Sequence, residues 1–172
     1  MMSQVKNIEE IFREYFSITE PPDRIIELGT GSGEFTELIW KLRNEQGGKF
    51  EIITFDKTQT MKYRPSNIIP IKCDIFKNIE MIGDMIQRDV LILCDNGYKI
   101  KEVECLAPYM RIGDVIMAHD YAYDIVSFYR SHIWTDCEIT YSDIRSIAIN
   151  NSLVPFHQDL MESGAWLSLR KI

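Results

Sequence analysis

No apolar run in the sequence is long enough to span a membrane, and the first ten residues lack the apolar stretch of a signal peptide. We therefore expect a cytoplasmic protein with no membrane partner. Basic side chains are also few, with 19 Lys and Arg against 26 Asp and Glu and a formal net charge of −7. Because nucleic-acid phosphates bind to basic surfaces, this balance argues against nucleic acid as a partner.

Cysteine is scarce and scattered. The sequence has no CxxC pair, and its cysteines lie far apart, at Cys73, Cys94, Cys105 and Cys137. This spacing argues against a zinc site and against thioredoxin-type redox chemistry. The composition is 45% hydrophobic and 26% charged, which is typical of a globular protein, and a length of 172 residues suits one domain covering residues 1–172.

Helical and strand-like patterns alternate along the chain. Apolar residues at helical spacing between Ile8 and Phe16 predict an amphipathic helix within residues 1–20. Short apolar strands separated by helical patterns follow this helix. Their alternation indicates an α/β fold with a mostly parallel sheet and helices on both faces. Pro70 falls within the third strand and predicts that this strand lies at an edge of the sheet. The predicted strands cover residues 24–28, 50–55, 67–72, 90–94 and 115–118.

The C-terminal part of the chain, residues 122–172, has a less regular pattern. Apolar residues between Ile125 and Tyr129 predict a short helix. Residues 138–141 and 165–170 have strand character, and we expect them to form an antiparallel hairpin at the end of the sheet.

A glycine-rich segment at residues 29–33, the glycine loop, stands between the first strand and the next helix. Glycines there allow a sharp turn and a close approach of ligand atoms to the backbone, and the following helix offers free N–H groups. The dinucleotide pattern GxGxxG would need glycine at position 34, where Glu34 stands, so the pattern is GxGxG. A plain structural turn is the alternative to ligand binding.

Acidic residues follow the second and third strands. Asp56 ends the second strand, where a carboxylate can accept two hydrogen bonds from a ribose diol. The alternative is a solvated loop carboxylate. Asp74 follows the third strand, and capping of a helix is an alternative to any ligand contact there.

The GxGxG pattern, with Glu27 ahead of it, resembles motif I of class I S-adenosylmethionine-dependent methyltransferases. The resemblance implies a Rossmann-like fold in which residues 24–121 form the cofactor-binding core. It also implies that Asp56 holds the ribose, that Asp74 accepts from the adenine amino group, and that Cys73 or Ile75 flanks the ring. The full set of cofactor-binding residues that we expect is Glu27, Gly29, Thr30, Gly31, Gly33, Asp56, Lys57, Cys73, Asp74, Ile75 and Asp95.

Two further acids come to the same sheet edge, because Asp95 follows the fourth strand and Asp120 follows the fifth. Residues 93–99 and 113–121 resemble metal-assisted O-methyltransferases, in the branch related to cephalosporin hydroxylase and macrolide sugar O-methyltransferases. The resemblance implies that Asp95 and Asp120 hold a divalent cation, usually Mg²⁺. His119 stands where that branch has an acid, and imidazole suits softer metals.

Several roles therefore stay open at this edge. Either the metal differs and His119 is a ligand, or His119 has another task, such as general base, or no metal binds. Without a metal, Asp95 would contact the methionine end of the cofactor and Asp120 would orient His119. We expect His119, Asp95 and Lys99 as catalytic residues, with Lys99 one position later than the lysine of catechol-type enzymes.

The sequence as a whole predicts an S-adenosylmethionine-dependent methyltransferase that modifies an oxygen of a small molecule or a glycan. A divalent cation such as Mg²⁺ would assist it if Asp95 and Asp120 bind one. The alternatives are an NAD-dependent oxidoreductase on a Rossmann-like fold and a non-catalytic protein that binds S-adenosylmethionine. Assembly into a homo-oligomer is also left open.

Overall fold

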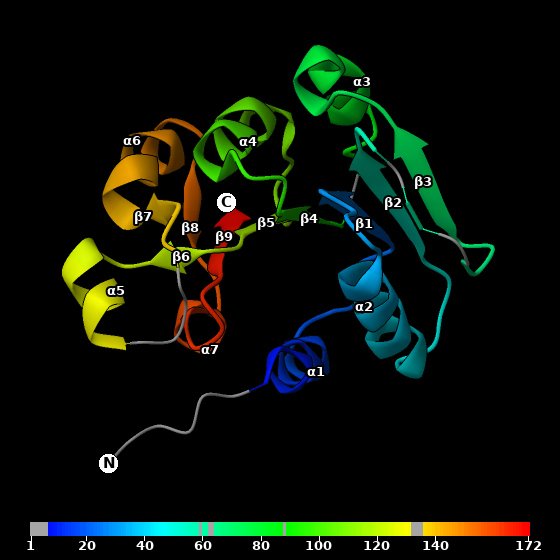
Figure 1. The fold of residues 1–172 in the computed structure, drawn as a ribbon, viewed down its shortest axis with the longest axis horizontal. Helices are drawn as coiled ribbons and strands as arrows, with labels where there is room; N and C mark the ends of the chain where they lie inside the picture. Colours follow the sequence, from blue (N-terminus) through cyan, green and yellow to red (C-terminus); the bar gives the residue numbers. More distant parts are fainter. Residues whose placement is uncertain (1–6, 59, 62–63, 88, 132–135) are drawn as a thin grey trace.

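The computed structural model describes residues 7–58, 60–61, 64–87, 89–131 and 136–172. Within these residues a seven-stranded sheet has the order β3-β2-β1-β4-β5-β9-β8 (Figure 1). Strands β1 to β5 are parallel, and β9 is antiparallel to both of its neighbours. The strands are β1 Arg24–Leu28, β2 Glu51–Asp56, β3 Ile68–Lys72, β4 Val90–Cys94, β5 Val115–Ala118, β8 Leu153–Pro155 and β9 Leu167–Lys171.

Helices cover both faces of this sheet (Figure 1). On one face α3, α4 and α6 bury residues such as Ile82, Val103 and Ile144, and on the other α1, α2 and α7 bury residues such as Phe12 and Ile39. Among the described residues no helix is long and apolar enough to cross a membrane. The helices are α1 Ile8–Ile18, α2 Glu34–Glu45, α3 Ile79–Asp84, α4 Lys99–Leu106, α5 Ile125–Ser131, α6 Tyr141–Asn150 and α7 Gln158–Glu162, with short 3₁₀ turns η1 Ile75–Lys77 and η2 Ala107–Tyr109.

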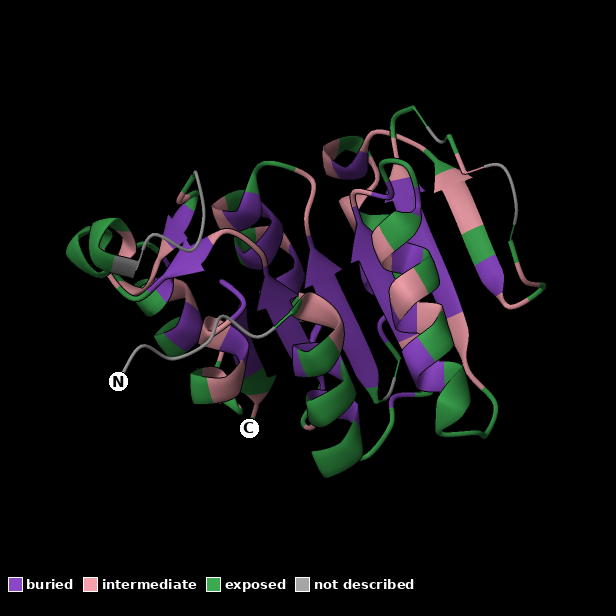
Figure 2. Cartoon of the chain, turned by 60° about the horizontal axis from the view of Figure 1, so that its bottom comes forward, coloured by how far each residue is buried: buried purple, intermediate pink, exposed green. Residues whose placement is uncertain are grey.

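The predicted α/β architecture is confirmed in its parallel half. The five strands expected there are present, and the central strand β4 is buried along its whole length (Figure 2). The third strand lies at the edge of the sheet, as Pro70 predicted, because a residue without an N–H group is tolerated best there. The short helix expected after residue 124 is α5, whose side chains are mostly exposed (Figure 2).

The predicted antiparallel hairpin between residues 138–141 and 165–170 is wrong. The final strand is present as β9, but the strand that forms an antiparallel pair with it at the edge of the sheet is β8. Residues Ile139–Thr140 form the short strand β7, which pairs in parallel with β6, Tyr121–Ala122, in a separate two-stranded sheet. This strand is short because Thr140 and Asp143 form a capping box, in which each side chain hydrogen-bonds to the other's backbone, and a helix begins at Tyr141.

Candidate active site

The glycine loop has a left-handed backbone at each of its glycines. The φ angles are 98° at Gly29, 50° at Gly31 and 89° at Gly33, which favour glycine over any other residue. A Cβ atom on Gly29 would lie 2.4 Å from the carbonyl oxygen of Asp95. Only glycine therefore lets the loop come this close to the end of β4.

Glu27 lies beneath the loop and not at its surface. Its side chain is 1% exposed, and one carboxylate oxygen accepts hydrogen bonds from the hydroxyls of Thr36 and Thr54. The other oxygen has no hydrogen-bond partner among the described residues. Burial raises the pKa of Glu27 to about 7, although the two threonine hydroxyls oppose this. Glu27 thus connects β1, β2 and α2 behind the loop, away from the space that a ligand could occupy.

A cavity of about 570 Å³ opens in front of the glycine loop. It lies at the carboxyl ends of β1, β2 and β4, where ligands bind in open α/β sheets. Asp56 borders it, with one carboxylate oxygen 3.0 Å from the Gly31 N–H group and the other accepting from Thr58. The lining residues are Ile8, Gly29, Thr30, Gly31, Ser32, Glu34, Phe35, Leu38, Asp56, Asp95 and Asn96.

Six of the residues expected to bind the cofactor lie outside this lining, namely Glu27, Gly33, Lys57, Cys73, Asp74 and Ile75. Asp74 caps η1 by accepting from the Phe76 N–H group, so the capping alternative is observed, and its carboxylate is also 3.4 Å from the Lys57 ammonium. Cys73 is partly buried, and Ile75 is 1% exposed within the core. The side chain of Ile75 therefore packs into the protein, whereas Asp74 and Lys57 remain accessible beside the loop.

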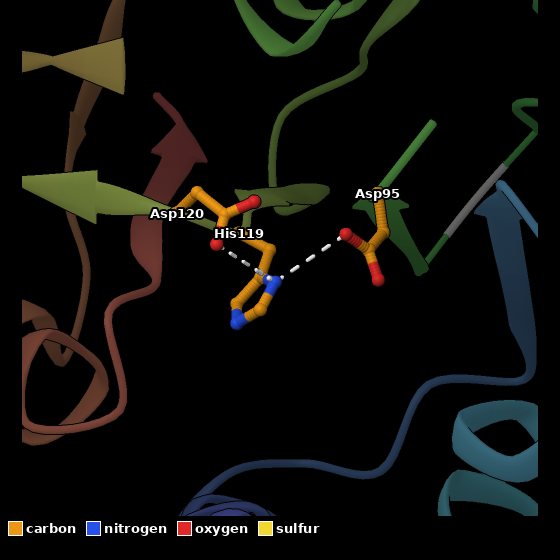
Figure 3. A group of neighbouring side chains, drawn as sticks. All are labelled: Asp95, His119 and Asp120. Carbon is orange, nitrogen blue, oxygen red and sulfur yellow. Dashed lines mark ion pairs between the residues drawn. The ribbon is translucent and has the colours of Figure 1, made fainter. Parts of the chain in front are cut away.

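Asp95, His119 and Asp120 come together at the ends of β4 and β5, and we call them the acid–histidine cluster (Figure 3). The Nδ1 atom of His119 lies 3.4 Å from a carboxylate oxygen of Asp95 and 3.4 Å from one of Asp120. One potential ligand atom from each residue lies within 4.8 Å of the others. The expected convergence of these side chains at one sheet edge is therefore present.

Lys99 completes the charge pattern of the cluster from the first turn of α4. Its ammonium lies 3.0 Å from Asp120 and 3.6 Å from Asp95, and the side chain is only 4% exposed. A third carboxylate, that of Glu138, lies 2.8 Å from the same ammonium. Burial alone would lower the pKa of Lys99, but these carboxylates outweigh it and raise the pKa to about 12. Lys99 is therefore a buried, charged lysine.

Sequence reasoning missed Glu138 and Trp166. Glu138 is placed by the pairing of β6 with β7, where its N–H group donates to the Asp120 carbonyl. Trp166 precedes β9, and its ring lies 4.8 Å from the ring of His119 and stacks on Phe35 at 5.2 Å. Phe35 lines the cavity, so an aromatic contact connects the cavity with the acid–histidine cluster.

A second cavity, of about 460 Å³, lies at the opposite end of the sheet. It is bordered by Tyr15, by the starts of β4 and β5, and by Arg170. None of the residues that line it belongs to the glycine loop or to the acid–histidine cluster. Because ligands of parallel α/β sheets bind at the carboxyl ends of the strands, the cavity in front of the glycine loop is the candidate active site.

The chain matches no protein-family profile and no curated protein. Its fold is shared with solved methyltransferase structures. A CmcI structure with Mg and SAM superposes with a TM-score of 0.62 at 14% identity, over 98% of this chain and 73% of that one. Human N-acetylserotonin methyltransferase in complex with SAM gives 0.59 at 12% identity, over 95% and 51% of the two chains.

MycE methyltransferase in complex with Mg, SAH and mycinamycin VI gives a TM-score of 0.52 at 16% identity, over 95% of this chain and 48% of that one. At such identities the similarity establishes the fold. The expected Rossmann-like methyltransferase fold is therefore confirmed, including the antiparallel strand near the C-terminus of the chain.

Proposed function

We propose that the chain is an S-adenosylmethionine-dependent methyltransferase that transfers the methyl group to an oxygen of a small molecule or sugar. The observation that carries this proposal is the cavity in front of the glycine loop, which is lined by Asp56 and by Asp95 of the acid–histidine cluster. A donor site and an acceptor site would then be adjacent at one sheet edge. The fold shared with structures that contain SAM or SAH supports the choice of donor.

In this proposal the glycine loop and Asp56 bind the nucleoside part of the donor. The loop offers close backbone approach, and the Asp56 carboxylate can accept from the ribose hydroxyls. Asp74 and Lys57, which are accessible beside the loop, are positioned near the adenine end. Asp95 lines the cavity and also belongs to the cluster, so it lies between the donor and the acceptor.

The side-chain oxygens and nitrogens of the acid–histidine cluster fit a divalent cation as ligand atoms. Two carboxylates and one imidazole within 4.8 Å of one another form a mixed oxygen and nitrogen set, which suits Mn²⁺ or Zn²⁺ as well as Mg²⁺. When bound, such a cation would lower the pKa of an acceptor hydroxyl and make it a better nucleophile. Asp95, His119 and Asp120 would hold the cation and orient the hydroxyl, and much of the rate would come from that positioning.

The proposal is tested by calorimetric titration of the chain with S-adenosylhomocysteine. Binding is expected, and Asp56→Ala should weaken it by about tenfold to a hundredfold, because hydrogen bonds to a charged group contribute roughly 1.5–3 kcal/mol. Asp159→Ala, an exposed carboxylate on α7, is the matched control and should leave the affinity unchanged. Binding of NAD in place of S-adenosylhomocysteine would indicate an oxidoreductase instead.

A further inference from the structure

The ammonium of Lys99 already occupies the position of a counter-ion within the acid–histidine cluster. It contacts Asp120 at 3.0 Å and Asp95 at 3.6 Å, and both residues contribute oxygens to the candidate cation site. The same Asp95 oxygen lies 3.4 Å from Nδ1 of His119. A divalent cation held by these atoms would therefore have a buried positive charge beside it, which opposes its binding.

Glu138 offers the lysine a partner outside the candidate cation site. Its contact with the ammonium, at 2.8 Å, is the shortest of the three, and its side chain is 38% exposed, against 30% for Asp95 and 20% for Asp120. The backbone contact between the Glu138 N–H group and the Asp120 carbonyl, at 3.0 Å, keeps this carboxylate beside the cluster. Lys99 can therefore remain paired while it gives up Asp95 and Asp120.

We propose that Lys99 is a positioning residue that sets the divalent-cation affinity of the acid–histidine cluster, and that Glu138 retains the lysine ammonium when a cation binds. This inference rests on the cation site proposed above. In the absence of a cation, Lys99 neutralises Asp95 and Asp120. In its presence, Lys99 is paired with Glu138 alone, and the two aspartates are available as ligands.

The test is a titration of the full chain with Mn²⁺, in which the concentration of the free ion is measured by electron paramagnetic resonance. Lys99→Met should tighten Mn²⁺ binding by about tenfold or more, because a close repulsive charge is removed. Lys101→Met is the matched control, since it makes the same charge change on the exposed side of α4, where the lysine lies over the Phe76 ring. It should change the affinity by less than about twofold.

Glu138→Gln should weaken Mn²⁺ binding by about tenfold, because Lys99 then has only Asp95 and Asp120 as charged partners. Glu104→Gln, an exposed carboxylate on α4, controls for the loss of one negative charge. The double variant of Lys99 and Glu138 is decisive. If Glu138 acts through the lysine, Glu138→Gln should have little further effect once Lys99 is methionine.

Unchanged or weaker Mn²⁺ binding in Lys99→Met would overturn the role of the lysine. An equal loss from Glu138→Gln in both backgrounds would overturn the role of Glu138. Titration of each variant with S-adenosylhomocysteine shows whether the protein is folded and whether the proposed function holds. If the nucleoside binds and Mn²⁺ binds to no variant, the inference fails and the methyltransferase proposal stands.

Discussion

Replacement of Glu27 by glutamine should remove much of the pH dependence of stability between about pH 5 and pH 8. The Glu27 carboxyl group is buried behind the glycine loop, and its pKa in the folded protein is about 7, against an ordinary value of 4.5. Between these two values the folded protein binds a proton that the unfolded chain releases. Stability contributed by this group is therefore complete below the lower value and is lost as the pH rises through the higher one.

The size of the effect follows from the two pKa values. At roughly 1.4 kcal/mol for each unit between the two pKa values, the free energy of unfolding should fall by about 3 kcal/mol between about pH 5 and pH 8 because of Glu27 alone. In Glu27→Gln the side chain resembles the protonated acid, and its amide oxygen can still accept from Thr36 and Thr54. The variant should therefore be more stable than the natural protein at about pH 8 and similar to it at about pH 5.

Urea denaturation at both pH values measures this difference directly. Glu37→Gln, an exposed glutamate on α2, the helix that carries Thr36, should leave the pH dependence unchanged. Glu102 is a second buried acid whose burial raises its pKa to about 7, so Glu102→Gln should remove a separate share of the effect. If Glu27→Gln has the same pH dependence as the natural protein, Glu27 is not protonated in the fold and the reasoning is refuted.

Two further predictions concern the loop and the aromatic contact. Gly29→Ala should abolish binding of S-adenosylhomocysteine and lower the free energy of unfolding by more than about 3 kcal/mol in urea denaturation, because its Cβ would overlap the Asp95 carbonyl. Gly31→Ala is the control, because no atom lies near the position of its Cβ, and it should lower the free energy of unfolding by only about 1–2 kcal/mol. Trp166→Leu should cost about 3 kcal/mol and should also weaken Mn²⁺ binding, since the ring packs on His119; an unchanged Mn²⁺ affinity would contradict that positioning role.

The parallel half of the fold is predictable from the sequence because each strand contains an apolar stretch with a clear boundary. Strand β4 is wholly apolar and is followed by Asp95, and β1 is followed directly by Gly29. The C-terminal half lacks such boundaries. Strand β8 has only three residues, and its place in the sheet depends on pairing with β9 instead of on any local preference.

The site divides in the same way. Asp56, Asp95 and Asp120 could be predicted because each lies at or just beyond the carboxyl end of a strand, and the ends of parallel strands meet at one edge. Glu138 and Trp166 could not, because they reach the cluster through the β6–β7 pairing and through the start of β9. Neither contact leaves a periodic or spacing signal in the sequence.

The backbone conformation of Asp120 is unusual, and this one residue contacts both Glu138 and the rest of the acid–histidine cluster. Its φ of 57° is left-handed, a conformation that costs a non-glycine residue about 1–3 kcal/mol. In this conformation Asp120 makes two sets of contacts. Its carbonyl accepts from the Glu138 N–H group, and its carboxylate contacts Lys99 and His119. Glycine would relieve the strain but would remove the carboxylate. The strain therefore lies at the residue that follows β5 and whose carbonyl accepts from the Glu138 N–H group, so these contacts are made at a cost in stability.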